Sequence, residues 1–239
     1  MNNRAAAALF AAVFAVVLIS TVPLGLVLGA AAPQAVGVTY QRATGTVWSG
    51  SVRGVSWAGR SWGDITVRLL PLELLRGRLD IAFDGAGAMR GAGRAGLGGG
   101  MRLNAPSLTI DLAALPLSVP LAGRLEVTEA DLVIDDDGCG RATARLATDA
   151  LVRGIGPVNW SGPRLAGGAR CEGADLVVAL TGGTGADAVE ITLRLKPGRA
   201  FRAEFAIAST DRAVAQALPL VGFSAQDGVY RLIQEGRWG

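Results

Sequence analysis

Few residues in this chain of 239 could perform acid–base or metal chemistry, because it contains no histidine. Histidine is the commonest general base and metal ligand, so neither a Ser-His-Asp nor a Cys-His site can be built. The only lysine, Lys196, stands beside Pro197-Gly198 in an expected turn. Several carboxylates fall on the polar phase of expected strands, among them Asp80, Asp84, Glu126 and Glu129. The sequence therefore predicts no catalytic residue, and we interpret the chain as a non-enzyme.

Two motifs that could bind a cofactor or a metal have a simpler interpretation. Gly91-Ala92-Gly93-Arg94-Ala95-Gly96 matches Gly-x-Gly-x-x-Gly, but Leu97-Gly98-Gly99-Gly100 follows, where a dinucleotide site needs a helix. This stretch is expected to form short hairpin strands instead. Asp135-Asp136-Asp137-Gly138 lacks the alternating ligands and the closing glutamate of a calcium loop, so it indicates a turn. No cofactor and no metal are predicted.

The two cysteines, Cys139 and Cys171, lack the Cys-x-x-Cys spacing of redox motifs. A pair of cysteines in an exported domain favours a structural disulfide. The chain-entropy model gives about 3–4 kcal/mol of stabilisation for a closed loop of this length. The alternative is two unpaired thiols.

An uncharged, largely apolar segment runs from Ala5 to Gln41, directly behind Arg4. It exceeds the length of about 20 apolar residues that a membrane-spanning helix needs. By the positive-inside rule, the N-terminus stays in the cytoplasm and the chain beyond the segment is exported. The sequence thus predicts a transmembrane anchor over residues 1–32 and an exported β-rich domain over residues 33–239. The alternative is a cleaved signal peptide, for which Gly29-Ala30-Ala31-Ala32 offers suitable small residues.

The exported part is predicted to be all-β. It combines 34 glycines with only 5% aromatic residues, which favours many short strands joined by tight turns. Apolar and polar residues alternate in many segments, most clearly in Leu79, Ile81 and Phe83. We expect one antiparallel meander, with a single domain helix over Asp211–Leu218. The spacing leaves open whether the sheet closes on itself, stacks as a sandwich or curls into a gutter.

The positive charge does not indicate nucleic-acid binding. The net charge is +3, and the arginines are scattered singly along the chain. Nucleic-acid binding favours cationic side chains clustered on one face. We therefore expect no nucleic-acid partner.

The first hairpin is expected at Gly45-Thr46-Val47-Trp48-Ser49-Gly50-Ser51, where β-forming residues are punctuated by glycines at turn spacing. We expect the ring of Trp48 to pack over a neighbouring strand that has little side chain of its own. Further along, Leu70-Pro71-Leu72-Glu73-Leu74-Leu75-Arg76-Gly77-Arg78-Leu79 is expected to contain a short helical turn over Pro71–Arg76, whose leucines close one end of the core.

These two segments resemble protein N of the type II (general) secretion pathway. In that family, a Gly-Thr-Val-Trp-Ser-Gly-Ser motif behind an N-terminal anchor precedes a Pro-Leu-x-Leu-Leu-x-Gly-x-Leu segment. The positions that match the family motifs are Gly45, Val47, Trp48, Gly50, Pro71, Leu75 and Gly77. The resemblance implies a single-pass protein of the cell inner membrane, with a cytoplasmic N-terminus and a periplasmic domain. It also implies a non-enzymatic accessory role in exporting folded proteins across the outer membrane, through contacts with other secretion-system subunits.

A second hypothesis is an envelope protein that handles lipid or another hydrophobe. A curled sheet with an apolar concave face can hold acyl chains. Leu79, Ile81 and Phe83, together with Ile191, Leu193 and Leu195, would line such a gutter. The simpler alternative is that these two groups pack against each other as a core.

Overall fold

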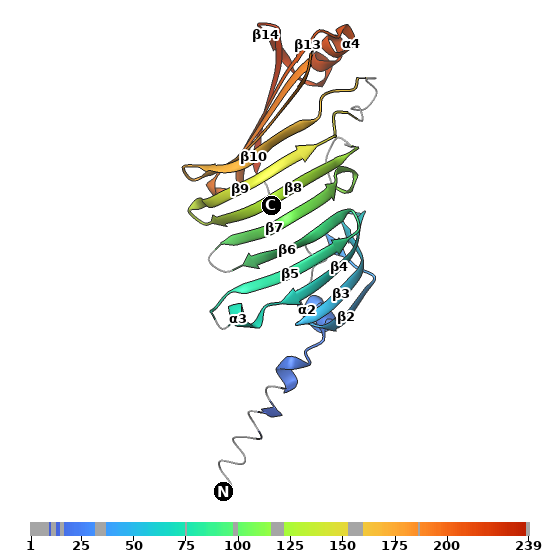
Figure 1. Cartoon of the computed structure of the whole chain (residues 1–239), viewed down its shortest axis with the longest axis vertical. Helices are drawn as coiled ribbons and strands as arrows, with labels where there is room; N and C mark the ends of the chain where they lie inside the picture. The colour runs from blue at the N-terminus through green and yellow to red at the C-terminus, as the bar shows by residue number, and fades with distance from the viewer. Residues whose placement is uncertain are drawn as a thin grey trace.

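A computed structural model describes residues 10, 13–14, 17–31, 37–74, 76–97, 100–115, 122–152, 160–185 and 187–237. The chain forms one antiparallel sheet of fifteen strands, in which almost every strand pairs with its neighbours in sequence (Figure 1). The predicted all-β meander is therefore confirmed. Within the described residues the two ends of the sheet do not pair with each other, so the sheet is open.

The strands in chain order are β1 (Val38–Thr39), β2 (Arg42–Thr46), β3 (Ser49–Trp57), β4 (Arg60–Leu69), β5 (Leu79–Ala86), β6 (Met89–Leu97), β7 (Met101–Asp111), β8 (Arg124–Asp135), β9 (Gly138–Thr148), β10 (Leu165–Glu172), β11 (Asp175–Thr184), β12 (Asp187–Leu195), β13 (Ala200–Ser209), β14 (Ser224–Gln226) and β15 (Val229–Arg237). The short helices are α2 (Leu24–Ala31), α3 (Pro71–Leu74), α4 (Arg212–Ala217), η2 (Leu112–Ala114), η3 (Pro197–Arg199) and η4 (Leu218–Val221).

One face of the sheet is apolar over most of its width. A single row of directly opposed residues crosses eleven strands from β4 to β15, and each member is apolar or glycine. The row consists of Ile65, Gly85, Gly91, Leu108, Val127, Leu146, Gly167, Leu180, Ile191, Phe205 and Leu232. The neighbouring residues along each strand point to the opposite face, which carries most of the charged side chains.

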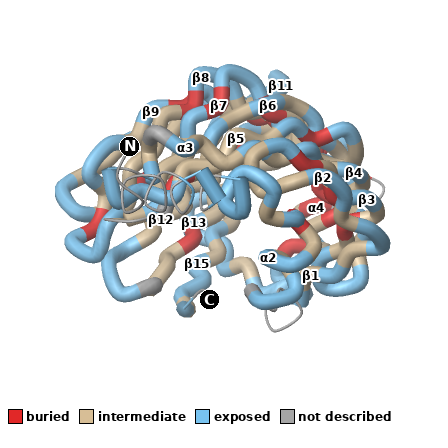
Figure 2. The backbone as a smooth tube through the Cα atoms, turned by 90° about the horizontal axis from the view of Figure 1, so that it is seen from below, coloured by how far each residue is buried: buried red, intermediate tan, exposed pale blue. Residues whose placement is uncertain are grey.

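The sheet curls along its length, as the view in Figure 2 shows. A hollow of about 480 Å³ is lined by Met101 of β7, Ile134 of β8, Leu176 of β11 and Leu195 of β12. These side chains share the apolar face, and they meet across β9 and β10, which lie between the adjacent strands β7 and β8 and the adjacent strands β11 and β12. The apolar face is therefore the concave, inner face of the gutter.

Buried side chains gather in three separate clusters. One cluster joins Trp160 and Leu165 to Val214 of α4 at the C-terminal end of the inner face. A second lies in the middle of the sheet around Ala105 and Leu108. The third joins Leu24 of α2 to β3 and β4 at the N-terminal end. The two ends of the inner face are thus covered by short helices, and most of its middle is only half-buried.

The helices are short, as the sequence predicts for an all-β fold. Helix α4 begins after Asp211, whose carboxylate accepts a hydrogen bond from the amide of Ala213, so the predicted domain helix is confirmed. Helix α3 forms where expected, but the side chain of Leu74 is 38% exposed and does not close the core. Leu75 lies outside the described residues. No helix in the described ranges is both long enough and apolar enough to cross a membrane.

The predicted disulfide between Cys139 and Cys171 is present, with their Cα atoms 5.6 Å apart. The ladder between β9 and β10 ends at the pair Thr143 and Arg170, and the disulfide joins the two strands beyond that pair. The amide of Cys139 also donates to the carbonyl of Ala174 over 2.8 Å. Cys171 itself lies inside β10, a strand that the sequence pattern does not predict. The bond therefore fastens adjacent strands where their backbone pairing stops.

Removing this disulfide should destabilise the protein without changing the fold. We expect Cys139→Ser and Cys171→Ser each to lower the free energy of unfolding by about 3–4 kcal/mol, because the unfolded chain regains the loop entropy. The double variant should lose no more than either single variant, since both remove the same bond. Urea unfolding of the three variants under non-reducing conditions measures this. Additive losses, or thiols of the native protein that alkylate quantitatively, would contradict the assignment.

Candidate functional site

The first family motif forms the hairpin that holds the N-terminal apolar segment against the sheet. The indole Nε1 of Trp48 donates to the carbonyl of Ile19 over 2.8 Å, and the amide of Val47 donates to the carbonyl of Val22 over 3.1 Å. The carbonyl of Val47 in turn accepts from the amide of Leu69 on β4. The turn of the β2–β3 hairpin thus connects the segment before Pro23 with the sheet.

The expectation that Trp48 packs over glycines of a neighbouring strand is wrong. Trp48 lies in the hairpin turn, is half-buried and uses its polar edge to hold Ile19. Trp160 is the more deeply buried ring, at 7% exposed, and it packs against a glycine of its own segment: a Cβ added to Gly162 would lie 2.7 Å from its ring carbon Cη2. The sequence marks both tryptophans in the same way, and only the tertiary contacts distinguish them.

Gly50, also a motif residue, lets helix α2 approach the sheet. A Cβ at this position would lie 2.5 Å from Cδ2 of Leu24 and 2.8 Å from the carbonyl oxygen of Thr46. Leu24 is 6% exposed and packs with Val52 and Val55 of β3. Gly45 lies opposite Gly50 in the ladder between β2 and β3. The motif therefore contacts both the chain before Pro23 and helix α2.

The second family motif forms a compact turn between β4 and β5. Pro71 begins α3, and the chain turns at Gly77 before β5. The amide of Leu70 donates to the carbonyl of Asp80, and the amide of Arg78 donates to the carbonyl of Glu73. This motif fixes the connection between the strands, and it does not touch the first motif in any described contact.

The inner face is a second candidate site because its apolar side chains are incompletely covered. Leu79 is 39% exposed and Met101 45% exposed, while Ile81, Leu193 and Leu195 are half-buried. The two groups expected to line a gutter, around Ile81 and Leu193, do lie on one face. Their members Phe83 and Ile191 belong to different packing clusters, so the groups do not form one core.

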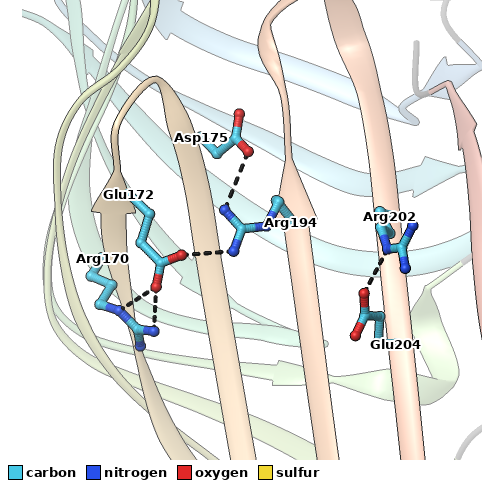
Figure 3. A network of polar contacts seen from close by, with 6 residues as sticks. All are labelled: Arg170, Glu172, Asp175, Arg194, Arg202 and Glu204. Atoms are coloured by element: carbon cyan, nitrogen blue, oxygen red, sulfur yellow. Dashed lines mark hydrogen bonds and ion pairs between the residues drawn. The ribbon is translucent and has the colours of Figure 1, made fainter.

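Arginines and carboxylates form a network on the outer face (Figure 3). Arg194 of β12 binds Glu172 over 2.7 Å and Asp175 over 3.3 Å, and Arg170 also binds Glu172. Hydrogen bonds from Arg194 and then Arg170 hold the pKa of the Glu172 carboxyl below its ordinary value. The network therefore fastens β10, β11 and β12 to one another on the outer face.

The other carboxylates that the sequence singles out also lie on the outer face. Asp80 binds Arg102 over 3.0 Å, Glu126 binds Arg164 over 2.8 Å, and Glu129 binds Arg145 over 3.2 Å. Asp84 is exposed on the same face of β5 as Asp80, and Lys196 is exposed beside η3. In the described part of the chain, no group of three or more carboxylates or cysteines could hold a metal ion.

A larger residue at position 50 should loosen the N-terminal junction selectively. We expect Gly50→Val to lower the free energy of unfolding by about 1–3 kcal/mol, the usual cost of overpacking, because the new side chain meets Leu24. Limited proteolysis should then cut within α2 first. Ser51→Val is the matched control, since Ser51 is the next residue of β3 and faces the other side. Equal protease resistance of both variants would contradict this role of Gly50.

Comparison with known families gives a match over most of the chain. The family model described as type II secretion system (T2SS), protein N, matches residues 36–233. This range includes all seven motif positions and runs from the start of the sheet into β15. Comparisons with curated proteins and with solved structures give no match. The chain belongs to the type II secretion system protein N family.

Proposed function

We propose that this protein is a non-enzymatic accessory component of the type II secretion system that supports the export of folded proteins across the outer membrane. The observation that carries this proposal is the family match over residues 36–233, which takes in nearly the whole sheet. The chemistry agrees with it: the chain has no histidine, and the outer carboxylates that we singled out are mostly held by arginines. Its role is to contact other secretion-system subunits.

We further propose that the protein is held in the inner membrane by its N-terminal segment, with the sheet in the periplasm. The uncharged run behind Arg4 supports this topology. Apolar side chains in that segment are largely exposed to solvent, including Phe10 at 73%, Phe14 at 54% and Ile19 at 56%. Insertion into a bilayer would remove this surface from water. The Cys139–Cys171 disulfide suits an oxidising compartment such as the periplasm.

Deleting the gene from a strain with a working type II system tests the secretion role. We expect the folded substrate to accumulate in the periplasm and its amount in the medium to fall, with recovery when the full-length chain is supplied. A reporter that is active only in the periplasm, fused after Gly239, should be active in membranes washed with high salt. Unchanged secretion would contradict the role. Release of a shortened soluble form would contradict the proposed membrane anchor but not the secretion role.

A second candidate function is the binding of a lipid or another hydrophobe, favoured by the half-buried inner face. The 480 Å³ hollow lies over the middle strands of that face, beside the turns that join them, and has an apolar wall formed by Met101, Ile134, Leu176 and Leu195. An open gutter of this kind offers acyl chains an apolar surface along the strands. This function would be compatible with membership of the secretion machine.

Mass spectrometry of lipids that co-purify with the protein tests this second function. We expect Leu193→Glu to remove the bound lipid, because Leu193 points into the gutter. Thr192→Glu is the matched control, since Thr192 is the adjacent residue of β12 and faces outward. Equal lipid content in both variants, or none in the unmodified protein, would exclude the gutter as a hydrophobe site.

A further inference from the structure

The two ends of the sheet differ in how they are covered. At the N-terminal end, α2 packs on β2, and Pro23 forms a bridge with Thr46 at its edge. At the C-terminal end, β14 pairs with Val229–Arg231 of β15 only. Beyond Arg231, no strand in the described ranges pairs with that side of β15. The segment Leu232–Arg237 is therefore a free strand edge.

The hairpin between β14 and β15 determines which backbone groups face outward. Its two-residue turn, Asp227-Gly228, has φ values of 51° and 78°, and Gln226 lies opposite Val229. In such a turn the closing residues form a hydrogen-bonded pair, so the backbone groups of Val229 face β14. Along an antiparallel strand, the backbone groups of successive residues point alternately to one side and to the other. The amides and carbonyls of Ile233 and Glu235 therefore point to the same side as those of Val229. No strand within the described residues pairs with them on that side.

The charged side chains along this edge do not cover it, and one exposed side chain on it is apolar. The carboxylate of Glu235 binds Arg202 of β13 over 2.7 Å, and Arg237 donates to the carbonyl of Gly198 over 3.1 Å. Both charges are thus drawn back over the protein's own sheet. Ile233 lies between Arg231 and Glu235 on the outer face and is 52% exposed. The free segment also lacks proline and lysine, which commonly protect exposed edges.

We propose that Leu232–Arg237 of β15 binds an extended segment of another protein, which adds to the sheet as its next strand. Backbone hydrogen bonds to Ile233 and Glu235 would supply the affinity, and side-chain pairs would supply the specificity. An apolar, β-branched or aromatic residue fits opposite Ile233. A hollow of about 90 Å³ beside Ile233 is lined in part by Glu190, Glu204 and Arg231, and Glu204 already binds Arg202. The hollow therefore offers groups of both signs to polar side chains on the same face of the segment.

The edge fits a different protein better than a second copy of this chain. Two registers pair most of Leu232–Arg237 antiparallel with itself. One register sets Glu235 directly opposite Glu235, and like charges in that position are destabilising. The other sets Ile233 opposite Glu235, which buries an apolar side chain against a charge. The partner's identity as a secretion-system subunit rests on the proposed function, whereas the binding edge does not.

A photo-activated cross-linking amino acid at position 233, in full-length protein in cells with a working secretion system, tests the proposal. We expect an adduct with a secretion-system subunit, identified by mass spectrometry. The same amino acid at Thr66, on the outer face of β4 and away from the edge, should give none. An adduct with twice the mass of the chain would show a second copy and overturn the proposal. No adduct at position 233 would also overturn it.

Two variants at Glu235 then test whether the contact is a strand addition. Glu235→Pro removes an outward amide, whereas Glu235→Gln keeps the amide and removes only the charge. We expect the adduct at position 233 to be lost in the proline variant and kept in the glutamine variant. An adduct kept in both, with unchanged melting temperatures, would contradict strand addition. If the proline variant does not fold, the comparison of cross-linking at positions 233 and 66 decides whether the edge binds another protein. An adduct in a strain whose secretion is unaffected by gene deletion would support the edge and refute the secretion role.

Discussion

Backbone pairing between strands that follow each other in sequence is the interaction on which the whole structure depends. From β3 to β12, each strand hydrogen-bonds to the strand before it and the strand after it. This connectivity needs only short turns, which the abundant glycines supply, and it requires no buried helix. It gives the sheet two faces, and because the sheet does not close on itself within the described residues, it also has two ends. Each result leads to one of the functional proposals.

The two faces differ because apolar and polar residues alternate along the strands. The inner face holds the apolar side chains, and with only short helices above it much of that face stays half-buried. On the outer face, paired arginines and carboxylates replace a second packed layer. Val177 illustrates this: it lies between Arg170 and Arg194 in the ladder and is only 1% exposed. Arginine side chains can cover apolar surface with their stems while their charged ends stay in water.

The sequence predicts the strands that alternate, and it misses β10, which does not alternate. Strand β5 is recognisable from Leu79, Ile81 and Phe83, whereas β10 reads Leu-Ala-Gly-Gly-Ala-Arg-Cys-Glu and shows no period. The disulfide could be predicted because only one pairing was available. The contact of Trp48 with Ile19 could not, since it joins residues 29 positions apart. The free edge of β15 was equally hidden, because it depends on where β14 stops.

Amide hydrogen exchange along β15 of the isolated protein tests the central claim, an open sheet with a free C-terminal edge, most directly. In an antiparallel strand, alternate amides face the two sides, and only those that face β13 have a partner beyond Arg231. The amides of Leu232, Gln234 and Gly236 should therefore exchange slowly, and those of Ile233 and Glu235 should exchange rapidly. Slow exchange at Ile233 and Glu235 in the monomeric protein would contradict the account, because it would require a partner strand within the chain.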